Sequence, residues 1–233
     1  DTRYELVDSN GLVPIRLSEK EYVRAHDFRR YLHKNLEDFI VETPLKEPLS
    51  ELIKDYDNSI DPSIEKTWKP YDFENSDIDE FLDELSIDKS VKVSPIKGGY
   101  KNAKNRLNEF IEKGYSDYAQ YRSDPSKRAS SEMSPYFHFG QISTHEVFEK
   151  IVQHEGWSLE KINPSLAGRR EGWWGGSFNM ESFFDELITW RELGYHTCVR
   201  RANYNQYSSL PEWAIKTLGE HSSDTREYVY TLE

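Results

Sequence analysis

The chain has 233 residues and a formal net charge of −12 at pH 7. Aromatic residues make up 14% of it, which excludes wholesale disorder, and no apolar run approaches the roughly 20 residues of a membrane span. A single cysteine excludes an internal disulfide, and so few cysteines and histidines argue against a structural zinc site. The chain starts with Asp1 and no signal peptide opens it, so we expect it to begin inside a longer, cytoplasmic protein.

The acidity is uneven along the chain. Residues 1–97 hold 14 basic and 23 acidic residues, whereas residues 98–233 hold 16 and 19, so the balances are −9 and −3. A surface that binds nucleic acid is normally basic, and the bulk charge therefore argues against DNA binding. A local basic patch in the less acidic second part stays open.

The start of the chain predicts two elements. Residues 4–17 are expected to form a short strand, a turn and a second apolar stretch. A helix is expected to follow, because Ser18 and Glu21 have the spacing of a capping box and apolar residues then recur every three or four positions as far as Phe39. The Thr43-Pro44 pair should end this helix.

Residues 44–97 are irregular, acidic and rich in proline, and we expect a long surface connector. One short helix is expected at 78–86, where Asp77 can act as the cap. Beyond the connector the second part of the chain has the pattern of an all-α domain, with polar loops at 122–131 and 155–178. Its helices are expected from residue 101, after the capping box of Ser143 and Glu146, over about 180–200, and near 211–220 with Ser209 as its cap.

The first group of candidate functional residues is rich in hydroxyls. It comprises Tyr118, Ser130, Ser131 and the run SPYFHFGQIS, which begins with Ser134. Clustered hydroxyls and backbone N–H groups between helices suit an anion such as a phosphate. Serine-rich loops also occur simply as caps and turns, and composition alone leaves both interpretations open.

The second candidate group lies in ESFFDELITWREL. Glu186 and Trp190 are four residues apart and share a helical face, while Arg191 points about a quarter of a turn away. A carboxylate beside an indole can recognise a flat heterocycle, because the ring stacks and the carboxylate accepts a base N–H. An exposed glutamate beside a tryptophan of the core is the alternative.

The third candidate group is a loop with Arg169, Arg170, Trp173 and Trp174. Basic residues interleaved with aromatics are typical of nucleic-acid contacts, but a glycine-flanked loop with two anchoring indoles has the same composition. No histidine or cysteine has a partner at metal-ligand or catalytic-triad spacing, and no glycine-rich phosphate loop occurs. An ordinary hydrolase therefore has no support.

These segments together resemble the photolyase/cryptochrome flavoproteins, most closely the class II cyclobutane pyrimidine dimer photolyases and their bacterial relatives. The resemblance runs in register over essentially the whole chain, although the connector contributes little to it. The segments that carry it are VDSNGLVPIRL (7–17), YAQYRSDPSKRASSEMSPYFHFGQIS (118–143), ESFFDELITWREL (181–193) and PEWAIKTLGEHSSDTREYVYT (211–231).

The resemblance implies a mainly α fold. This would be the first part of a photolyase-type helical FAD-binding domain, preceded by the last strand region of an α/β antenna-type domain and a long linker. The implied boundaries are 1–43 for the end of the antenna-type domain and its exit helix, 44–97 for the linker, and 98–233 for the FAD-binding part. The chain would then be a fragment that binds flavin weakly or not at all, repairs no DNA alone, and has the remainder of the photolyase chain as its partner.

The implied function is light-driven, FAD-dependent splitting of cyclobutane pyrimidine dimers in UV-damaged DNA by photoinduced electron transfer, with no membrane involved. Glu186 and Trp190 would contact the flipped-out lesion. Glu132 departs from the pattern of many relatives, so an anion there would be held by backbone N–H groups. The resemblance assigns FAD binding to Tyr118, Ser130, Ser131, Met133, Ser134, Phe183 and Arg191. Arg169, Arg170, Trp173 and Trp174 are expected to bind DNA on the composition of their loop, which the resemblance leaves undecided.

Two other functions remain open at this point. One is a cryptochrome-like blue-light photoreceptor with the same fold, which signals without repairing DNA. The other is a flavin-free helical module for protein–protein interaction, which the acidity and the limited extent of the chain favour. Glu186 and Trp190 favour repair over the photoreceptor.

Overall fold

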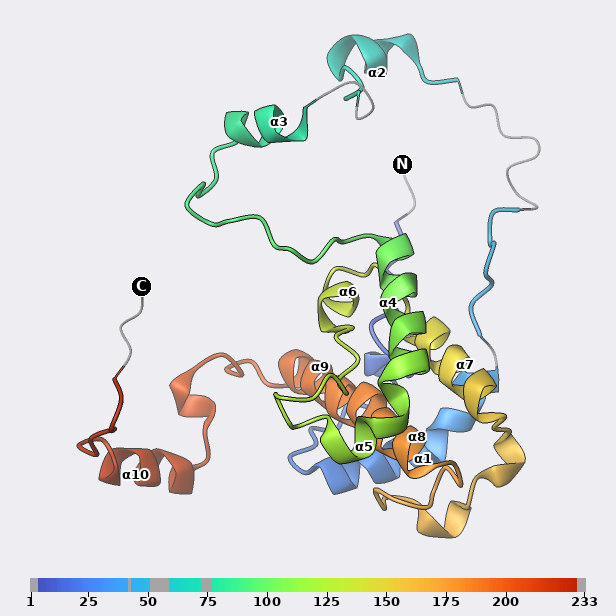
Figure 1. The fold of residues 1–233 in the computed structure, drawn as a ribbon, viewed down its shortest axis with the longest axis vertical. Coiled ribbons are helices and arrows are strands. Elements are labelled where there is room, and N and C mark those ends of the chain that lie inside the picture. Colours follow the sequence, from blue (N-terminus) through green and yellow to red (C-terminus); the bar gives the residue numbers. More distant parts are fainter. Residues whose placement is uncertain (1–3, 42, 51–58, 73–76, 230–233) are drawn as a thin grey trace.

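The computed structural model describes residues 4–41, 43–50, 59–72 and 77–229, and these contain helices and no strand. The mainly α fold is confirmed. Figure 1 shows a body built from α1 and α4–α9, with α2, α3 and α10 lying apart from it. The helices are α1 (Ala25–Val41), α2 (Pro62–Thr67), α3 (Ile78–Glu84), α4 (Tyr100–Lys113), α5 (Tyr118–Tyr121), α6 (Ser134–His138), α7 (Thr144–Glu155), α8 (Phe178–Phe184), the π-helical segment η6 (Asp185–Trp190), α9 (Arg191–Arg200) and α10 (Glu212–Glu220).

The core forms where α1, α4, α7 and α8 meet. Their apolar residues recur at helical spacing, so each helix turns one stripe inward. Aromatic rings join the stripes: Phe148 of α7 stacks on Phe184 of α8 at 4.9 Å between ring centroids. The fully or nearly fully buried side chains include Phe28, Leu32, Leu36, Leu107, Phe110, Val147, Ile151, Met180 and Phe184.

Two helix starts and one helix end follow the sequence signals. The Asp77 carboxylate accepts a hydrogen bond from the Asp79 N–H at 2.9 Å and so caps α3. The Ser143 hydroxyl accepts one from the Glu146 N–H at 3.0 Å and caps α7. Helix α4 ends at Gly114, the position where its apolar pattern weakens.

Two predicted helix starts are wrong. Helix α1 begins at Ala25 and not at Ser18, because tertiary contacts claim the preceding residues: the Ser18 carbonyl accepts a hydrogen bond from Arg200 at 2.7 Å. The side chain of Glu21 pairs with Arg201 and does not reach back to Ser18. Ser209 does not cap α10 either, since Pro211 precedes this helix and Ser209 belongs to a separate 3₁₀ turn, η7 (Tyr207–Ser209).

The strand expected within residues 4–17 is not formed. Residues 4–7 are exposed, and no strand among the described residues lies beside them. A strand is stable only when its backbone groups pair with a neighbour, so the apolar alternation is not sufficient by itself. Residues Ile15–Leu17 instead form a 3₁₀ turn, η1.

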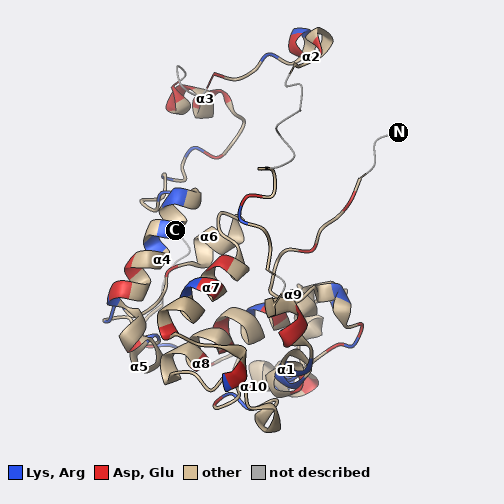
Figure 2. Cartoon of the chain, turned by 90° about the vertical axis from the view of Figure 1, so that its right-hand side faces the viewer, with Lys and Arg blue, Asp and Glu red and all other residues tan. Residues whose placement is uncertain are grey.

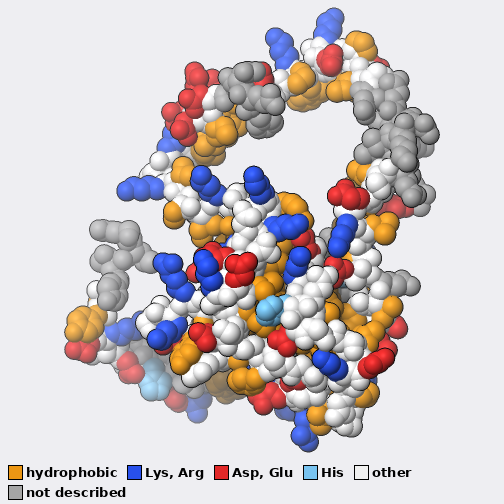
Figure 3. All heavy atoms as spheres, turned by 45° about the vertical axis from the view of Figure 1, so that its right-hand side comes forward, with side chains coloured by type: hydrophobic (Ala, Val, Ile, Leu, Met, Phe, Trp, Pro, Cys, Tyr) orange, Lys and Arg blue, Asp and Glu red, His pale blue; other side chains and the backbone are white. Residues whose placement is uncertain are grey.

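The described parts of the connector are exposed, as predicted. Figure 3 shows that the part with α2 and α3 arches away from the helical body, and Figure 2 shows acidic residues gathered on α3. The apolar stripe of α3 is largely exposed at Ile78 and Leu85, and its Phe81 ring contacts Tyr71 at 4.7 Å between ring centroids. The sequence analysis missed α2, which Asp61 caps by accepting the Ser63 N–H at 2.8 Å and which starts with Pro62. No helix in the described ranges is long and apolar enough to cross a membrane.

A buried carboxylate fastens the start of the chain to α9. The Glu192 carboxylate accepts a hydrogen bond from the Leu12 N–H at 2.6 Å. A Cβ at Gly11 would lie 2.5 Å from Glu192 Oε1, so only glycine allows this close approach. Residues 11–41 consequently share one core with α8 and α9. The domain boundaries at 43/44 and 97/98 stay predictions.

Glu192 generates a prediction about pH. Its burial raises the pKa of this carboxyl to about 8, with a contribution from Asp8, while the Leu12 and Val13 N–H groups and Arg191 act in the opposite direction. Between the ordinary value of 4.5 and about 8, the folded state therefore holds the proton more tightly than the unfolded state does. The free energy of unfolding should fall as pH rises through this window, by roughly 1.4 kcal/mol for each unit of pKa difference.

The substitution Glu192→Gln should remove most of this slope, because an amide does not titrate. The fold should be kept, since the amide oxygen can still accept the Leu12 N–H. Urea unfolding of both chains across the window measures it. Parallel losses of stability in the two chains would contradict the assignment to Glu192.

Candidate functional site

One continuous helix carries the second candidate group. Helix α8, the π-helical η6 and α9 follow one another from Phe178 to Arg200, which confirms the helix expected over about 180–200. Ser177 caps it by accepting the Met180 N–H at 3.1 Å. The π-helical turn was not predicted. It places residues five apart above one another, and such turns are frequent at functional sites.

The π-helical turn joins its first and last residues. The Trp190 Nε1–H donates a hydrogen bond to Asp185 Oδ2 at 3.2 Å. Asp185 is buried and also accepts hydrogen bonds from Arg29 of α1, whose Nε lies at 2.8 Å. Trp190 is 49% exposed. The structure therefore holds one edge of the indole inside the protein and leaves much of the ring accessible.

Glu186 lies next to Asp185 and has a different partner. Its carboxylate forms a half-buried ion pair with Arg122 at 2.6 Å. The Arg122 guanidinium also lies 5.9 Å from the centre of the Tyr118 ring. Burial raises the pKa of Tyr118 to about 12, so this phenol is neutral near pH 7. Since a π-helical turn takes more residues than an α-helical one, Glu186 and Trp190 stay close to one face, but each is bonded to a different neighbour.

A second buried acid holds the loop that follows α7. The Glu181 carboxylate accepts a hydrogen bond from the Gly172 N–H, and burial raises the pKa of this carboxyl. Arg169 and Arg170 are exposed on this loop. The Nε atom of Arg170 lies 3.7 Å from Asp185 Oδ2, so the loop places a cation beside the carboxylate that holds Trp190.

The predicted DNA contacts of Trp173 and Trp174 are wrong. The two residues are only 3% and 4% exposed, which leaves no ring face for a nucleobase. Trp173 stacks on His33 of α1 at 3.8 Å between ring centroids, and burial lowers the pKa of His33 to about 3. The Trp174 carbonyl accepts a hydrogen bond from the Trp157 indole at 2.6 Å. Both rings anchor the loop, and only its arginines remain as candidates.

The hydroxyl-rich segment 130–134 has an unusual backbone. Glu132 adopts φ = +55°, a left-handed conformation that few residues other than glycine take, and Met133 follows in the right-handed helical region. Consecutive residues of opposite hand turn their N–H groups to one side and form a concavity that suits an anion. Arg106 supports the segment, because its Nε donates to the Ser131 carbonyl at 3.0 Å and lies 3.5 Å from the Glu132 carboxylate.

Three of the residues assigned to FAD by resemblance lie in the core. Phe183 packs edge-on against Tyr118 at 5.2 Å between ring centroids and lies 5.3 Å from Phe110. Met133 is fully buried. The side chains of Phe183, Tyr118 and Met133 can therefore support a ligand site from behind, whereas Ser130 and Ser134 are exposed.

Arg191 is engaged with the start of the chain. Its guanidinium donates to the Asn10 carbonyl and, at 3.3 Å, to the Thr144 hydroxyl. It also lies over the rings of Phe137 and Tyr195, at 5.0 and 4.8 Å from their centres. The cation thus joins α9 to α6, α7 and the N-terminal segment.

Comparison with known proteins finds relatives that match most of the chain. No family model matches the chain. The deoxyribodipyrimidine photo-lyase of Methanothermobacter thermautotrophicus is 31% identical over 227 residues, which cover 97% of this chain and 42% of that protein. That of Potorous tridactylus is 27% identical over 229 residues, and cryptochrome-2 of Arabidopsis thaliana is 47% identical over 51 residues. The chain belongs to the photolyase and cryptochrome family. It spans about 40% of the length of the photolyases it matches.

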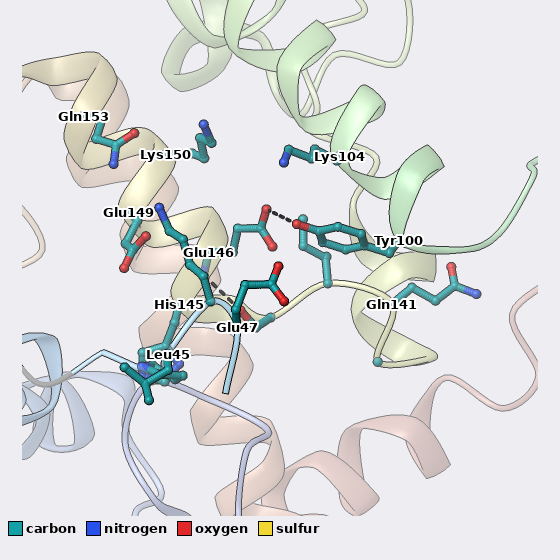
Figure 4. A pocket seen from close by; sticks show the side chains of 15 residues that line it. Leu45, Glu47, Tyr100, Lys104, Gln141, His145, Glu146, Glu149, Lys150 and Gln153 are labelled. Carbon is teal, nitrogen blue, oxygen red and sulfur yellow. Dashed lines mark hydrogen bonds between the residues drawn. The ribbon is translucent and has the colours of Figure 1, made fainter. Parts of the chain in front are cut away.

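One cavity among the described residues of this photolyase-family chain lies away from the candidate residues. It has a volume of about 650 Å³ and lies between α4, α7 and residues 44–47. Figure 4 shows the Tyr100 hydroxyl directed at Glu146, to which it donates a hydrogen bond of 3.0 Å. Side chains of both charges line this cavity, and none of the predicted site residues does.

Sequence reasoning missed the residues that position the candidate site. The sequence analysis singled out none of Asp185, Glu181 and Arg122. Arg29 does carry a periodic signal. It falls on the stripe that contains Leu32 and Leu36, and a cation on the buried face of a helix predicts a buried acid as its partner.

The corrected placement of the loop gives a second prediction. Trp173→Ala should lower the free energy of unfolding by about 3–5 kcal/mol, because it leaves a cavity in the core and removes the stacking on His33. Trp213→Ala is the matched control, since Trp213 is 72% exposed on α10. Urea unfolding measures both. Equal, small effects of the two substitutions would show that the Trp173 ring is not part of the core.

Proposed function

We propose that this chain is the first part of the helical FAD-binding domain of a class II-like DNA photolyase, which splits cyclobutane pyrimidine dimers in a light-driven reaction. The observation that carries the proposal is the half-exposed Trp190 indole, held at its edge by Asp185 and accompanied by Glu186. Photolyase relatives that match 97% of the chain support it. The activity would belong to the whole protein, and the remaining part of that protein would be the partner of this chain.

Trp190 would bind the lesion by stacking. A pyrimidine dimer must leave the base stack to reach an enzyme site, and a distorted lesion lowers the free energy that this requires. A nucleobase stacked on an aromatic side chain gains about 1–3 kcal/mol. Because the Trp190 ring is held before binding, little side-chain entropy is lost when the base arrives.

Glu186 would accept a hydrogen bond from the edge of the flipped base. Its carboxylate is already paired with the Arg122 guanidinium, so a base would meet a carboxylate whose charge is balanced by a cation. The pair offers both an acceptor and donors beside the stacking surface. This arrangement suits the base edge of a pyrimidine, which carries both an N–H donor and carbonyl acceptors.

The segment 130–134 would hold the phosphates of FAD. The opposite-handed pair Glu132–Met133 and the exposed hydroxyls of Ser130 and Ser134 fit an anion, and the ion pair of Glu132 with Arg106 offsets the acidic charge there. Ser131 would add a hydroxyl, Tyr118 and Phe183 would pack behind the cofactor, and Arg191 would add positive charge. When bound, reduced FAD supplies the electron that opens the cyclobutane ring.

Arg169 and Arg170 would contact phosphates of the DNA backbone near Trp190. Each such contact is expected to add about one unit to the salt dependence of binding. The net charge of −12 requires that other parts of the whole protein supply further positive charge. A cytoplasmic location and the class II assignment remain predictions.

The proposal predicts the effect of Trp190 on DNA binding. In the protein that contains this chain, Trp190→Ala should weaken binding to an oligonucleotide with a pyrimidine dimer by about 1–3 kcal/mol, with much less effect on undamaged DNA. Trp213→Ala, another exposed tryptophan, should leave both affinities unchanged. Fluorescence anisotropy of labelled oligonucleotides measures the binding, and an absorption spectrum of the same preparation measures its flavin content.

The possible results separate the proposed function from its alternatives. Equal affinity of the Trp190→Ala and unsubstituted proteins for the dimer would contradict the repair function. A flavin-containing protein without preference for the dimer would support the photoreceptor function. A protein without flavin bands and without DNA binding would support the interaction module.

A further inference from the structure

A buried carboxylate connects three separate segments at the candidate lesion site. Asp185 Oδ1 lies 2.8 Å from both Nε and Nη2 of Arg29, which belongs to α1. Asp185 Oδ2 lies 3.2 Å from the Trp190 indole nitrogen and 3.7 Å from Nε of Arg170 in the loop after α7. The side chain of Asp185 is almost completely buried. The Oδ1 atom of this carboxylate therefore contacts Arg29. Its Oδ2 atom contacts Trp190 and lies near Arg170.

We propose that Asp185 is the positioning residue for Trp190, and that Arg29 on α1 holds Asp185 in the orientation that this requires. The inference deepens the proposed function, because it rests on Trp190 being the surface that receives the lesion. It assigns no contact with the DNA to Asp185 itself. Asp185 acts only through the indole.

The helix geometry explains why this contact exists. In an α-helix, two residues five positions apart point about 140° away from each other around the axis, so Asp185 and Trp190 could not meet. In the π-helical turn Asp185–Trp190 they lie above one another. The unusual turn and the hydrogen bond across it therefore depend on each other.

The charges explain why the carboxylate stays in place. A buried carboxylate is stable only when cations and hydrogen-bond donors surround it, and here two guanidinium groups and one indole N–H do so. Arg29 is itself buried, and its Nη1 also donates to the Gly168 carbonyl at 3.4 Å. The guanidinium is therefore fixed on both sides, and the Oδ1 contact leaves Oδ2 directed at Trp190.

The consequence is a ring that is ordered before it binds. Trp190 is half exposed, and without the hydrogen bond its side chain would sample several rotamers. Loss of this order should weaken binding of dimer-containing DNA by roughly two- to tenfold, since an immobilised side chain is one that need not be ordered on association. The indole itself would still be present.

The test observes the Trp190 indole directly. In a nitrogen-15 correlation spectrum of the chain, Trp190→Phe identifies the indole signal of Trp190. In the unsubstituted chain its Nε1–H should exchange with deuterium more slowly than that of the exposed Trp213. In Asp185→Asn the Trp190 signal should shift and lose this protection, while the signals of the core residues Trp173 and Trp174 stay in place and report an intact fold.

Two further variants keep the test decisive. Asp185→Asn leaves Arg29 buried without its anion, so a double variant with Arg29→Gln removes both charges and should release Trp190 in the same way. Glu192→Gln replaces another buried acid of the same helix and should leave the Trp190 signal unchanged. The proposal is overturned if Trp190 exchanges as fast as Trp213 in the unsubstituted chain, or if its signal is unaffected in both Asp185 variants.

DNA binding by the whole protein distinguishes a failure of this inference from a failure of the proposed function. If Trp190→Ala weakens dimer binding but Asp185→Asn changes neither the indole signal nor the affinity, only the positioning role is wrong. If Asp185→Asn releases the indole and Trp190→Ala has no effect on dimer binding, the positioning role stands and the lesion site is wrong.

Discussion

The ion pair between Arg29 and Asp185 is the interaction on which the arrangement of the candidate site depends. It joins Arg29 of α1 to Asp185 of the π-helical turn, which lies 156 positions later in the sequence. Both partners are buried, so removing either one would leave an unpaired buried charge. Such a charge lowers the free energy of unfolding by about 3–5 kcal/mol. The pair therefore fixes the register of α1 on the central helix, and the positions of Trp190 and of the arginine loop follow from it.

The buried acids of the continuous helix α8–η6–α9 all hold other segments of the chain in place. Asp185 accepts a hydrogen bond from α1, Glu181 accepts one from the loop after α7, and Glu192 accepts one from the backbone next to Gly11. Each one replaces the water that its donors would otherwise bind, and each donor comes from a different part of the chain. The exposed side chains of the site therefore belong to a helix that these three contacts hold in place. A rigid element of this kind allows precise placement of a binding surface.

The sequence predicts the helices and the candidate surface better than it predicts what holds them. Local signals were sufficient for α3, α4 and α7, where a cap or a glycine acts on the helix that contains it. They failed at Ser18, because the contacts that keep this residue extended come from Arg200, 182 positions later.

In the candidate site, too, the sequence indicates some features, and only the structure shows the others. Trp190 could be chosen from its spacing to Glu186, whereas the pairing with Asp185 depends on a π-helical turn that no periodicity indicates. The loop REGWWGG has a composition that fits a surface contact and a core anchor equally well. Burial assigns its two tryptophans to the core, whereas its Arg170 and the preceding Arg169 are exposed.

The contact between Glu192 and the Leu12 backbone closes a loop of 180 positions, and the exposed connector lies inside that loop. The entropy of closing a flexible loop grows only slowly with its length. Connectors of quite different length could therefore join the same two segments with little change in stability. For the same reason, a chain cleaved within the connector would give two fragments whose shared core favours reassociation, so the connector offers a place to divide this domain without dividing its core.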